Sequence, residues 1–196
     1  LAPNSVQEMH DHVGLGMDLA FKYRNPAMIL ADGAIGQMME KVVLAPQRPR
    51  KTEEEIRQEC RTWASYGKDA DRERNVVTSL ELQSEVMEKI NQRLQAKYKA
   101  MEENEVRYEA IDCDDADYVI VAFGSSARIC SATVEMARAE GIKVGLLRPI
   151  TLYPFPTKVI AQMAQRGVKG FLSAELNAGQ MVQDVRPVSY THLRAH

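Results

Sequence analysis

The stretch from Tyr118 to Leu176 decides the fold, and it opens with Tyr118-Val-Ile-Val-Ala-Phe-Gly-Ser-Ser126. Apolar runs cover residues 118–123, 144–147 and 170–174, and stretches of helical character separate them. Short, nearly continuous apolar runs are typical of strands that helices cover on both faces. The alternation predicts an α/β fold with a piece of parallel sheet, arranged as βαβαβ, in which these strands are central.

The first crossover helix is expected from Ser126 to Glu140. Ser125 or Ser126 can cap its N-terminus, and Gly141 follows its end. One side of this helix carries Ile129, Thr133, Met136 and Ala137. A second helix is expected from Pro156 or Thr157 to Gln165, and a third from Gly179 toward Val185.

Open parallel sheets bind ligands beyond the carboxyl ends of their strands. These ends are expected at Gly124–Ser126, Arg148–Pro149 and Glu175–Gly179. The Gly124 turn could bind an anion through its N–H groups, but it has neither the lysine of a P-loop nor the spaced glycines of a dinucleotide site, so a tight turn is the simpler reading. Glu175 could act as an acid or base or contact another subunit. No partner for it is recognisable, and catalysis is not visible in the sequence.

Composition indicates an ordinary soluble protein. The 196 residues are 45% hydrophobic and 27% charged, with a net charge of -2. No apolar run approaches the roughly 20 residues of a membrane-spanning helix, so a cytoplasmic location is expected. Cys60, Cys113 and Cys130 lack a Cys-x-x-Cys spacing and read as plain thiols. The chain begins with leucine and is expected to be a fragment.

The N-terminal region combines a capped helix with a glycine-containing turn. Ser5-Val-Gln-Glu8 reads as a capping box for a helix that runs to about Tyr23, where Asn25-Pro26 stops it. A short buried strand is expected at Ala27–Ala31. The turn Asp32-Gly33-Ala-Ile-Gly36-Gln37 follows it and is a second place where a ligand could lie.

His10 and His12 stand two residues apart on this helix, so their side chains point in nearly opposite directions. They cannot chelate one ion, and no metal site is predicted.

The middle of the chain is charged. Residues 46–75 read as a linker or excursion, helical at Glu53–Trp63, with charges of alternating sign that suit a solvated face. A long helix is expected at Leu80–Glu103, where an apolar stripe recurs at steps of four residues. We regard this helix as suited to subunit contact.

Four segments together resemble one family. They are Leu1-Ala-Pro-Asn-Ser-Val-Gln-Glu-Met9, Tyr23-Arg-Asn-Pro-Ala-Met-Ile-Leu-Ala-Asp-Gly-Ala-Ile-Gly-Gln-Met-Met-Glu40, Gly145-Leu-Leu-Arg-Pro-Ile-Thr-Leu-Tyr-Pro-Phe-Pro156 and Glu175-Leu-Asn-Ala-Gly-Gln-Met-Val-Gln-Asp-Val-Arg186. The chain resembles the alpha subunit of a 2-oxoacid:ferredoxin oxidoreductase, nearest the branched-chain (2-ketoisovalerate, 3-methyl-2-oxobutanoate) type. The resemblance covers residues 1–186.

The resemblance implies a domain plan. Residues 1–45 would be the C-terminal part of a pyrimidine-binding domain for thiamine diphosphate, and residues 46–107 a charged linker with a long helix. Residues 108–186 would form the transketolase C-terminal-like domain II. Residues 187–196 do not continue the family pattern and resemble a translated sequencing adapter, so this tail is expected to be non-native.

The resemblance also implies a function. Family members oxidatively decarboxylate a 2-oxoacid with coenzyme A, which gives acyl-CoA and CO2 and reduces ferredoxin. Thiamine diphosphate and Mg²⁺ would be held mainly by a partner beta subunit, and the iron–sulfur clusters by other (gamma and delta) subunits. The catalytic residues of the family lie upstream of Leu1, so none is assigned here. Asp32, Gly33 and Gln37 are candidates for lining the cofactor side or a subunit interface, on position alone.

A second hypothesis comes from another functional class. The chain could be a non-catalytic α/β module that binds a nucleotide at the Gly124 turn or serves as a scaffold. Neither hypothesis expects the isolated fragment to be active, because part of a cofactor domain cannot enclose a cofactor.

Overall fold

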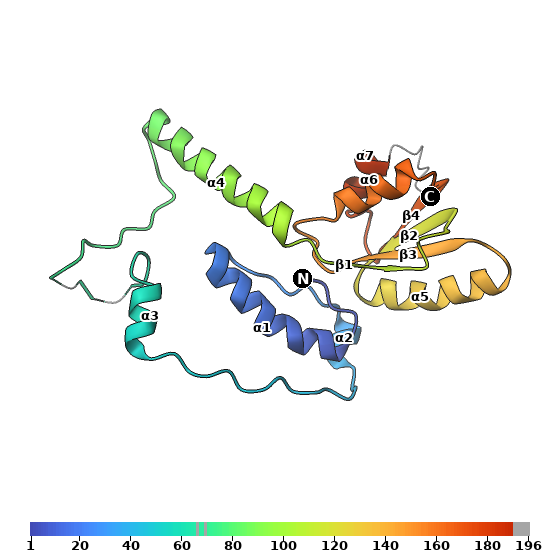
Figure 1. The fold of residues 1–196 in the computed structure, drawn as a ribbon, viewed down its shortest axis with the longest axis horizontal. Coiled ribbons are helices and arrows are strands. Elements are labelled where there is room, and N and C mark those ends of the chain that lie inside the picture. Colours follow the sequence, from blue (N-terminus) through green and yellow to red (C-terminus); the bar gives the residue numbers. More distant parts are fainter. Residues whose placement is uncertain (66, 69, 190–196) are drawn as a thin grey trace. The chain divides into compact units, whose positions relative to one another are not determined.

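The computed structural model describes residues 1–65, 67–68 and 70–189, and Figure 1 shows its helices and strands along the chain. The order is α1 (Val6–Tyr23), α2 (Gly33–Gln37), α3 (Glu53–Glu59), α4 (Ser84–Asn104), β1 (Tyr108–Ile111), β2 (Tyr118–Ala122), α5 (Gly124–Ala139), β3 (Val144–Pro149), α6 (Thr157–Gln165), β4 (Gly170–Ala174) and α7 (Val182–Ser189).

The sheet confirms the predicted α/β fold. Its strand order is β1-β3-β2-β4; β2 pairs in parallel with both β3 and β4, while β1 pairs antiparallel with β3. Strand β1 was not predicted, because Tyr108-Glu-Ala-Ile111 lacks a continuous apolar run and most of it is exposed. An antiparallel edge strand on a largely parallel sheet is common in such folds.

The prediction that all three apolar strands are central is wrong for β4. Among the described residues, β4 lies at the edge of the sheet. The side chain of Phe171 is buried, but that of Leu172 is exposed. An apolar run therefore did not distinguish a strand covered on both faces from one covered on only one face.

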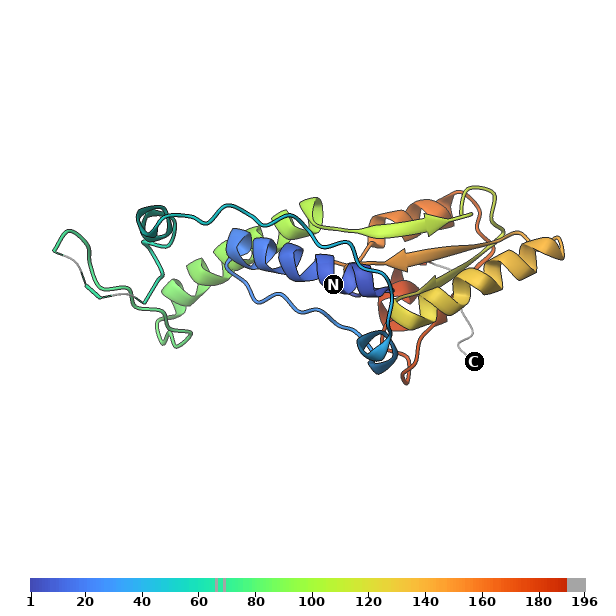
Figure 2. The same cartoon turned by 90° about the horizontal axis from the view of Figure 1, so that it is seen from below.

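Helices cover both faces of the sheet, α5 on one and α6 with α7 on the other (Figure 1). Successive side chains of a strand point to opposite faces. Val119 and Val121 accordingly join the core beneath α6 and α7, while Ile120 and Ala122 join the core beneath α5. Figure 2 shows α5 running along the strands that it covers.

Helix α5 confirms the predicted crossover but differs in its cap and its buried side. Its N-cap is Phe123, which makes no side-chain cap bond, in place of Ser125 or Ser126. The buried stripe is Ala127, Cys130 and Val134. Ile129 and Met136, from the side noted in the sequence, are 64% and 70% exposed. Small side chains allow the helix to approach the sheet closely, and periodicity alone favoured the larger apolar residues.

Residues 1–44 begin with the predicted capped helix α1. Ser5 Oγ accepts the N–H of Glu8 at 3.2 Å, and the Glu8 carboxylate accepts the N–H of Asn4 at 2.9 Å, one residue earlier than in an ordinary capping box. The predicted buried strand Ala27–Ala31 is wrong. That segment is extended but largely exposed. In the described chain its backbone pairs only with Leu1, which donates to the carbonyl of Met28 and accepts the N–H of Leu30.

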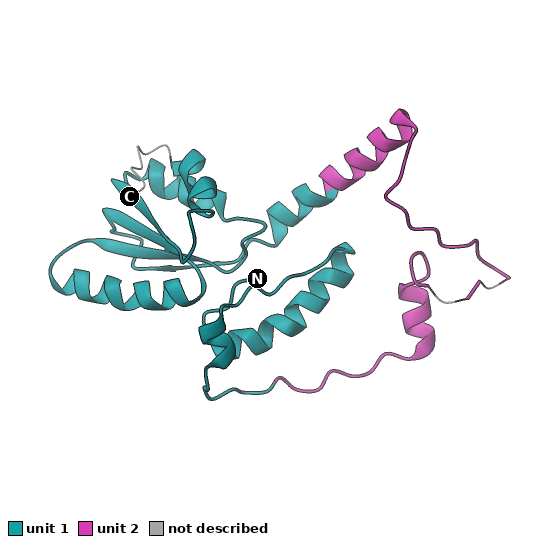
Figure 3. Ribbon diagram, turned by 180° about the vertical axis from the view of Figure 1, so that it is seen from behind, with its two compact units in different colours: residues 1–44, 97–196 teal, residues 45–96 magenta. Residues whose placement is uncertain are grey.

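Residues 45–96 form a compact unit separate from the rest of the described chain (Figure 3). Within it, Thr52 and Glu55 make a reciprocal capping box at the start of α3. The long helix is confirmed, although α4 starts at Ser84 instead of Leu80.

No helix in the described part of the chain has the length and apolarity needed to cross a bilayer. The predicted domain boundaries stay predictions.

The predicted non-native tail begins inside α7, at Pro187. Residues 190–196 of that tail lie outside the described residues.

Candidate functional site

The strand ends that the sequence offered as ligand sites are engaged by carboxylates of the protein itself. The first is the Gly124 turn. Asp32 Oδ2 accepts the N–H of Ser125 at 3.2 Å, while Asp32 Oδ1 accepts the N–H groups of Ala34 and Ile35 at 2.9 and 3.0 Å. The two turns singled out in the sequence therefore meet, and Asp32 joins them.

Hydrogen bonds from Ser125 and from the backbone of Ile35 lower the pKa of Asp32, so this carboxylate stays ionised where amide dipoles converge. Gly124 has φ 57°, and a Cβ there would lie 3.6 Å from Asp32 Oδ2. The Gly124 turn thus lies against the Asp32 carboxylate, an anion supplied by the chain itself. This arrangement disfavours binding of a phosphate by the Gly124 turn, because Asp32 already takes the place of the anion.

Arg148 lies at the second strand end. It is 3% exposed, and its guanidinium donates to both oxygens of Glu8 at 2.7 and 2.8 Å. The Nε of Arg148 donates to Glu109 on the adjacent strand at 2.8 Å. Burial would raise the pKa of Glu8, but the hydrogen bonds from Arg148 and from the Asn4 N–H outweigh it, so the pKa lies below its ordinary value. Glu8 thus caps α1 and also neutralises a buried cation at the end of β3.

Glu175 lies at the third strand end, where its oxygens accept backbone N–H groups from Gln180, Met181 and Val182 at 3.1, 2.8 and 2.9 Å. Burial would raise the pKa of Glu175, yet the amide bonds from Met181 and Val182 hold it below its ordinary value. A carboxylate held ionised by its own loop is poorly suited to proton transfer. The structure therefore favours a role in closing the loop before α7.

The three candidate residues differ in their surroundings. Asp32 is the N-cap of α2, whereas Gly33 and Gln37 lie exposed at its two ends. A Cβ at Gly33 would meet no atom within 4 Å. Gly33 and Gln37 thus present an open surface, while the carboxylate of Asp32 faces Ser125 at the start of α5.

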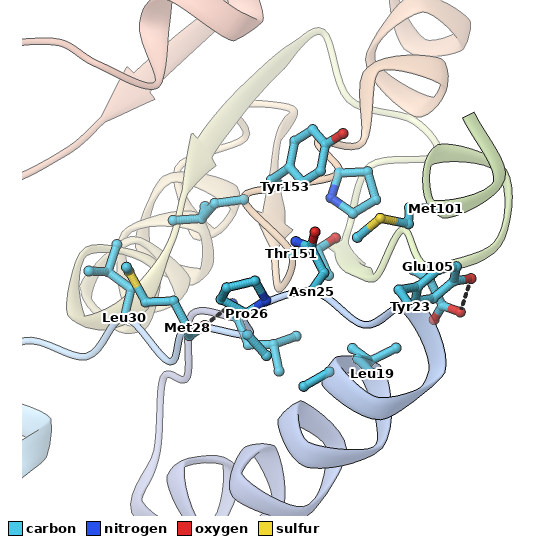
Figure 4. A pocket seen from close by; sticks show the side chains of 15 residues that line it. Leu19, Tyr23, Asn25, Pro26, Met28, Leu30, Met101, Glu105, Thr151 and Tyr153 are labelled. Carbon is cyan, nitrogen blue, oxygen red and sulfur yellow. Dashed lines mark hydrogen bonds between the residues drawn. The ribbon is translucent and has the colours of Figure 1, made fainter. Parts of the chain in front are cut away.

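A pocket of about 300 Å³ lies between α1, the extended segment after it, the end of α4 and the loop before α6 (Figure 4). Its walls are mostly apolar, with Leu19, Pro26 and Met28 on one side and Tyr153 on the other. Its polar end is Glu105, which is 5% exposed.

Glu105 is the centre of a polar cluster that sequence reasoning missed. It accepts bonds from Lys22 Nζ at 2.6 Å, from the Tyr23 hydroxyl at 2.7 Å and from Arg107 at 3.0 Å. Burial would raise the pKa of Glu105, but these donors outweigh it and lower the pKa to about 2. Because all three donors belong to the protein, the cluster ties α1 to the residues after α4.

No group of three metal-ligating side chains occurs among the described residues. His12 is buried, and burial lowers its pKa, while its Nδ1 has no hydrogen-bond partner in the described structure. The three cysteines are buried and free. Burial raises the pKa of Cys113 to about 11, which keeps that thiol protonated.

The sequence did not predict that Arg148 and Glu105 would each gather charged partners from distant parts of the chain. For Arg148, however, the sequence held a clue. An arginine that directly continues an apolar strand must find a carboxylate if it is buried. The position of that carboxylate, 140 residues earlier in the chain, carried no such signal.

Replacing Asp32 with alanine is expected to lower the free energy of unfolding by about 1–2 kcal/mol, because three backbone N–H groups lose their acceptor. The measurement is urea unfolding at pH 7. The matched control is Glu135→Ala, which removes a carboxylate from an exposed position of α5. An Asp32→Ala protein as stable as the wild type would contradict a capping role and return Asp32 to the cofactor candidates.

Comparison with known proteins adds a family relationship. The family model described as pyruvate flavodoxin/ferredoxin oxidoreductase, thiamine diphosphate-binding, matches residues 1–110. A second model, pyruvate:ferredoxin oxidoreductase core domain II, matches residues 116–195.

Two curated proteins illustrate the similarity. Ketoisovalerate oxidoreductase subunit VorB of Methanothermobacter marburgensis is 48% identical over 189 residues, an alignment that covers 96% of this chain and 51% of that protein. The 2-oxoglutarate synthase subunit KorA of Methanocaldococcus jannaschii is 28% identical over 204 residues, covering 96% and 55%. The chain thus spans about half the length of the curated relatives it matches.

Among solved structures, the 2-oxoglutarate:ferredoxin oxidoreductase from Magnetococcus marinus, with 2-oxoglutarate, coenzyme A and succinyl-CoA bound, superposes with a TM-score of 0.72. The match covers 97% of this chain and 37% of that one at 16% sequence identity. At this identity the likeness shows the fold alone.

Proposed function

Because the chain belongs to the pyruvate flavodoxin/ferredoxin oxidoreductase family, we propose that it is part of an enzyme subunit that oxidatively decarboxylates a 2-oxoacid with coenzyme A and reduces ferredoxin. The observation that carries the proposal is the family match over residues 1–110, followed in order by the domain II match. It confirms the resemblance drawn from four separate segments of the sequence.

The substrate proposed is a branched-chain 2-oxoacid. Two ketoisovalerate oxidoreductase subunits are 48% and 47% identical to this chain, against 27–30% for the 2-oxoglutarate synthase subunits. The residues that would grip a substrate carboxylate are not recognisable here, so the proposal rests on this difference in identity.

Thiamine diphosphate, when bound, would supply the carbanion chemistry of the reaction. The described residues do not fit its diphosphate and metal: none of them form a group of three side chains placed to hold a metal ion, and Asp32 occupies the amide groups at the start of α2 and α5. We therefore propose that a partner beta subunit holds the diphosphate and Mg²⁺. Gly33 and Gln37 would contribute surface on the cofactor side or at that interface.

Iron–sulfur clusters are proposed to lie in the other (gamma and delta) subunits. Cys60, Cys113 and Cys130 are each buried, and none belongs to a metal-ligating group in the described chain. The proposed location of the complex is the cytoplasm.

The test is an assay of the full-length protein assembled with its partner subunits. Reduction of a viologen dye is followed with coenzyme A and, in turn, 2-ketoisovalerate, 2-oxoglutarate and pyruvate. We expect kcat/KM for 2-ketoisovalerate to exceed the others by roughly tenfold or more, about the discrimination that one or two methyl groups provide in an apolar pocket. No reduction with any 2-oxoacid would reject the enzyme assignment. Preference for 2-oxoglutarate would reject only the substrate.

A further inference from the structure

A second concavity, which shares Tyr153 with the pocket beside α1, lies where the end of α4, the start of β1, the loop before α6 and helices α6 and α7 meet. Its volume is about 640 Å³. The residues that give it its character are Tyr108, Tyr153, Phe155, Glu102, Glu103 and Asp184. We call it the Tyr108 groove.

Aromatic side chains line the Tyr108 groove. Tyr108 and Tyr153 are 44% and 56% exposed, which is high for rings of this size. Tyr98 contacts Tyr153 edge to face, with ring centroids 6.4 Å apart, and this contact helps to hold the Tyr153 ring. Exposed aromatic rings in a concave site attract cationic side chains as well as apolar ones.

Acidic side chains also line the groove. Glu102, Glu103 and Asp184 are exposed, and Lys158 is the only cationic residue among those that line the groove. No hydrogen bond or ion pair of the described chain engages the carboxylates of Glu102 and Glu103. Burial and the negative charge of Glu102 together raise the pKa of Tyr153, so the Tyr153 ring lies within the electrostatic field of Glu102.

The position of two of these acids is locally unfavourable. Glu102 and Glu103 lie in the last turn of α4, which contains no basic residue. The carbonyl end of a helix favours cations and repels carboxylates. The groove thus combines two unpaired carboxylates with the negative end of a helix dipole, a field that a cationic partner would neutralise.

The groove also borders a free strand edge. Strand β1 pairs with β3 on one side, and within the described chain no strand pairs with its other side. Tyr108 is its first residue. An edge of this kind can accept an extended segment through backbone hydrogen bonds, while neighbouring pockets take the side chains.

We propose that the Tyr108 groove is the docking site of an extended, Lys- or Arg-bearing segment of a partner subunit. The aromatic rings and carboxylates receive the cationic side chains, and the free edge of β1 orients the backbone. Charge complementarity selects this occupant: an acidic segment, or one without cations, would leave Glu102 and Glu103 unneutralised.

The inference rests on the proposed function, which supplies the partner subunits, and is tested in the purified full-length complex. The photo-reactive residue p-benzoylphenylalanine replaces Tyr108, and in a control it replaces Met136 on the exposed side of α5. Irradiation at Tyr108 should crosslink a partner subunit at a peptide containing Lys or Arg. Irradiation at Met136 should not yield that peptide.

A Glu102→Gln/Glu103→Gln variant provides the charge test. Both side chains are exposed, so the fold should be unchanged by circular dichroism. The Tyr108 crosslink should fall at least about fivefold in this variant and should weaken in high salt. A crosslink to a second copy of this chain, a captured peptide without Lys or Arg, or no crosslink would overturn the proposal. If the complex crosslinks but oxidises no 2-oxoacid, the proposed function fails and the docking site stands.

Discussion

Replacing Arg148 with methionine is expected to lower the free energy of unfolding by about 3–5 kcal/mol, the cost of breaking a buried ion pair by removing one partner. The Arg148 side chain is 4% exposed and forms ion pairs with Glu8 and Glu109. Methionine keeps most of the volume but leaves the half-buried Glu8 without its cation. The measurement is urea unfolding of the chain at pH 7.

A double-mutant cycle separates the pair from general damage to the core. Glu8→Gln alone should also destabilise, while the Arg148→Met/Glu8→Gln protein should be more stable than the sum of the two losses predicts, because no buried charge is left unpaired. The control is Arg128→Met, which breaks the more exposed pair with Glu40 and should cost less than about 1 kcal/mol. Strict additivity of the two losses in free energy of unfolding would show that Arg148 and Glu8 do not stabilise the fold as an ion pair.

Replacing Glu105 with glutamine is expected to lower the free energy of unfolding by about 3 kcal/mol at pH 7. The physical reason is the fall in the pKa of Glu105 from an ordinary 4.5 to about 2 on folding. Glutamine retains the shape but loses the charge that faces Lys22 and Arg107. Glu88→Gln, the same change at an exposed position of α4, should alter stability by less than about 0.5 kcal/mol.

The pH dependence of Glu105 has a definite sign. Because its pKa is lower in the folded chain, the unfolded chain takes up the proton first as the pH falls. The stabilisation is fully present above about pH 4.5 and is lost progressively as the pH falls toward about 2. The difference in free energy of unfolding between the wild type and the Glu105→Gln variant should therefore shrink as the pH falls from about 4.5 to about 2. A difference that stays constant down to pH 2 would show that the carboxylate charge is not its source.

Local patterns in the sequence predicted much of the fold. The apolar runs at 118–123, 144–147 and 170–174 became β2, β3 and β4, and the Ser5–Glu8 pattern marks the start of α1. These predictions succeeded because a strand buried between helices and a capped helix each depend on residues that are neighbours in sequence. Strand β1 was missed because pairing with β3, and not its own composition, makes it a strand.

The predictions that failed concerned contacts across the fold. Ala27–Ala31 is apolar enough for a buried strand, but a buried strand needs strands paired on its edges, and in the described chain the backbone of this segment pairs only with Leu1. On α5, Ile129 and Met136 looked suited to the core, but the close approach of the helix favoured Ala127 and Cys130. Hydrophobicity indicates which residues can be buried; only packing decides which of them are.

The candidate site shows the same division. The sequence by itself determined the βαβαβ order, the capped first helix, the family, and the turns at Asp32 and Gly124. Only the tertiary structure decided that Asp32 closes the Gly124 turn, that Glu8 pairs with Arg148, and that Glu105 gathers Lys22, Tyr23 and Arg107. The physical reason is that a charged group is stabilised by whichever opposite charge or donor the fold brings near it. Glu8 and Arg148 are 140 residues apart in the sequence, and that separation gives no indication that the two side chains meet in the fold.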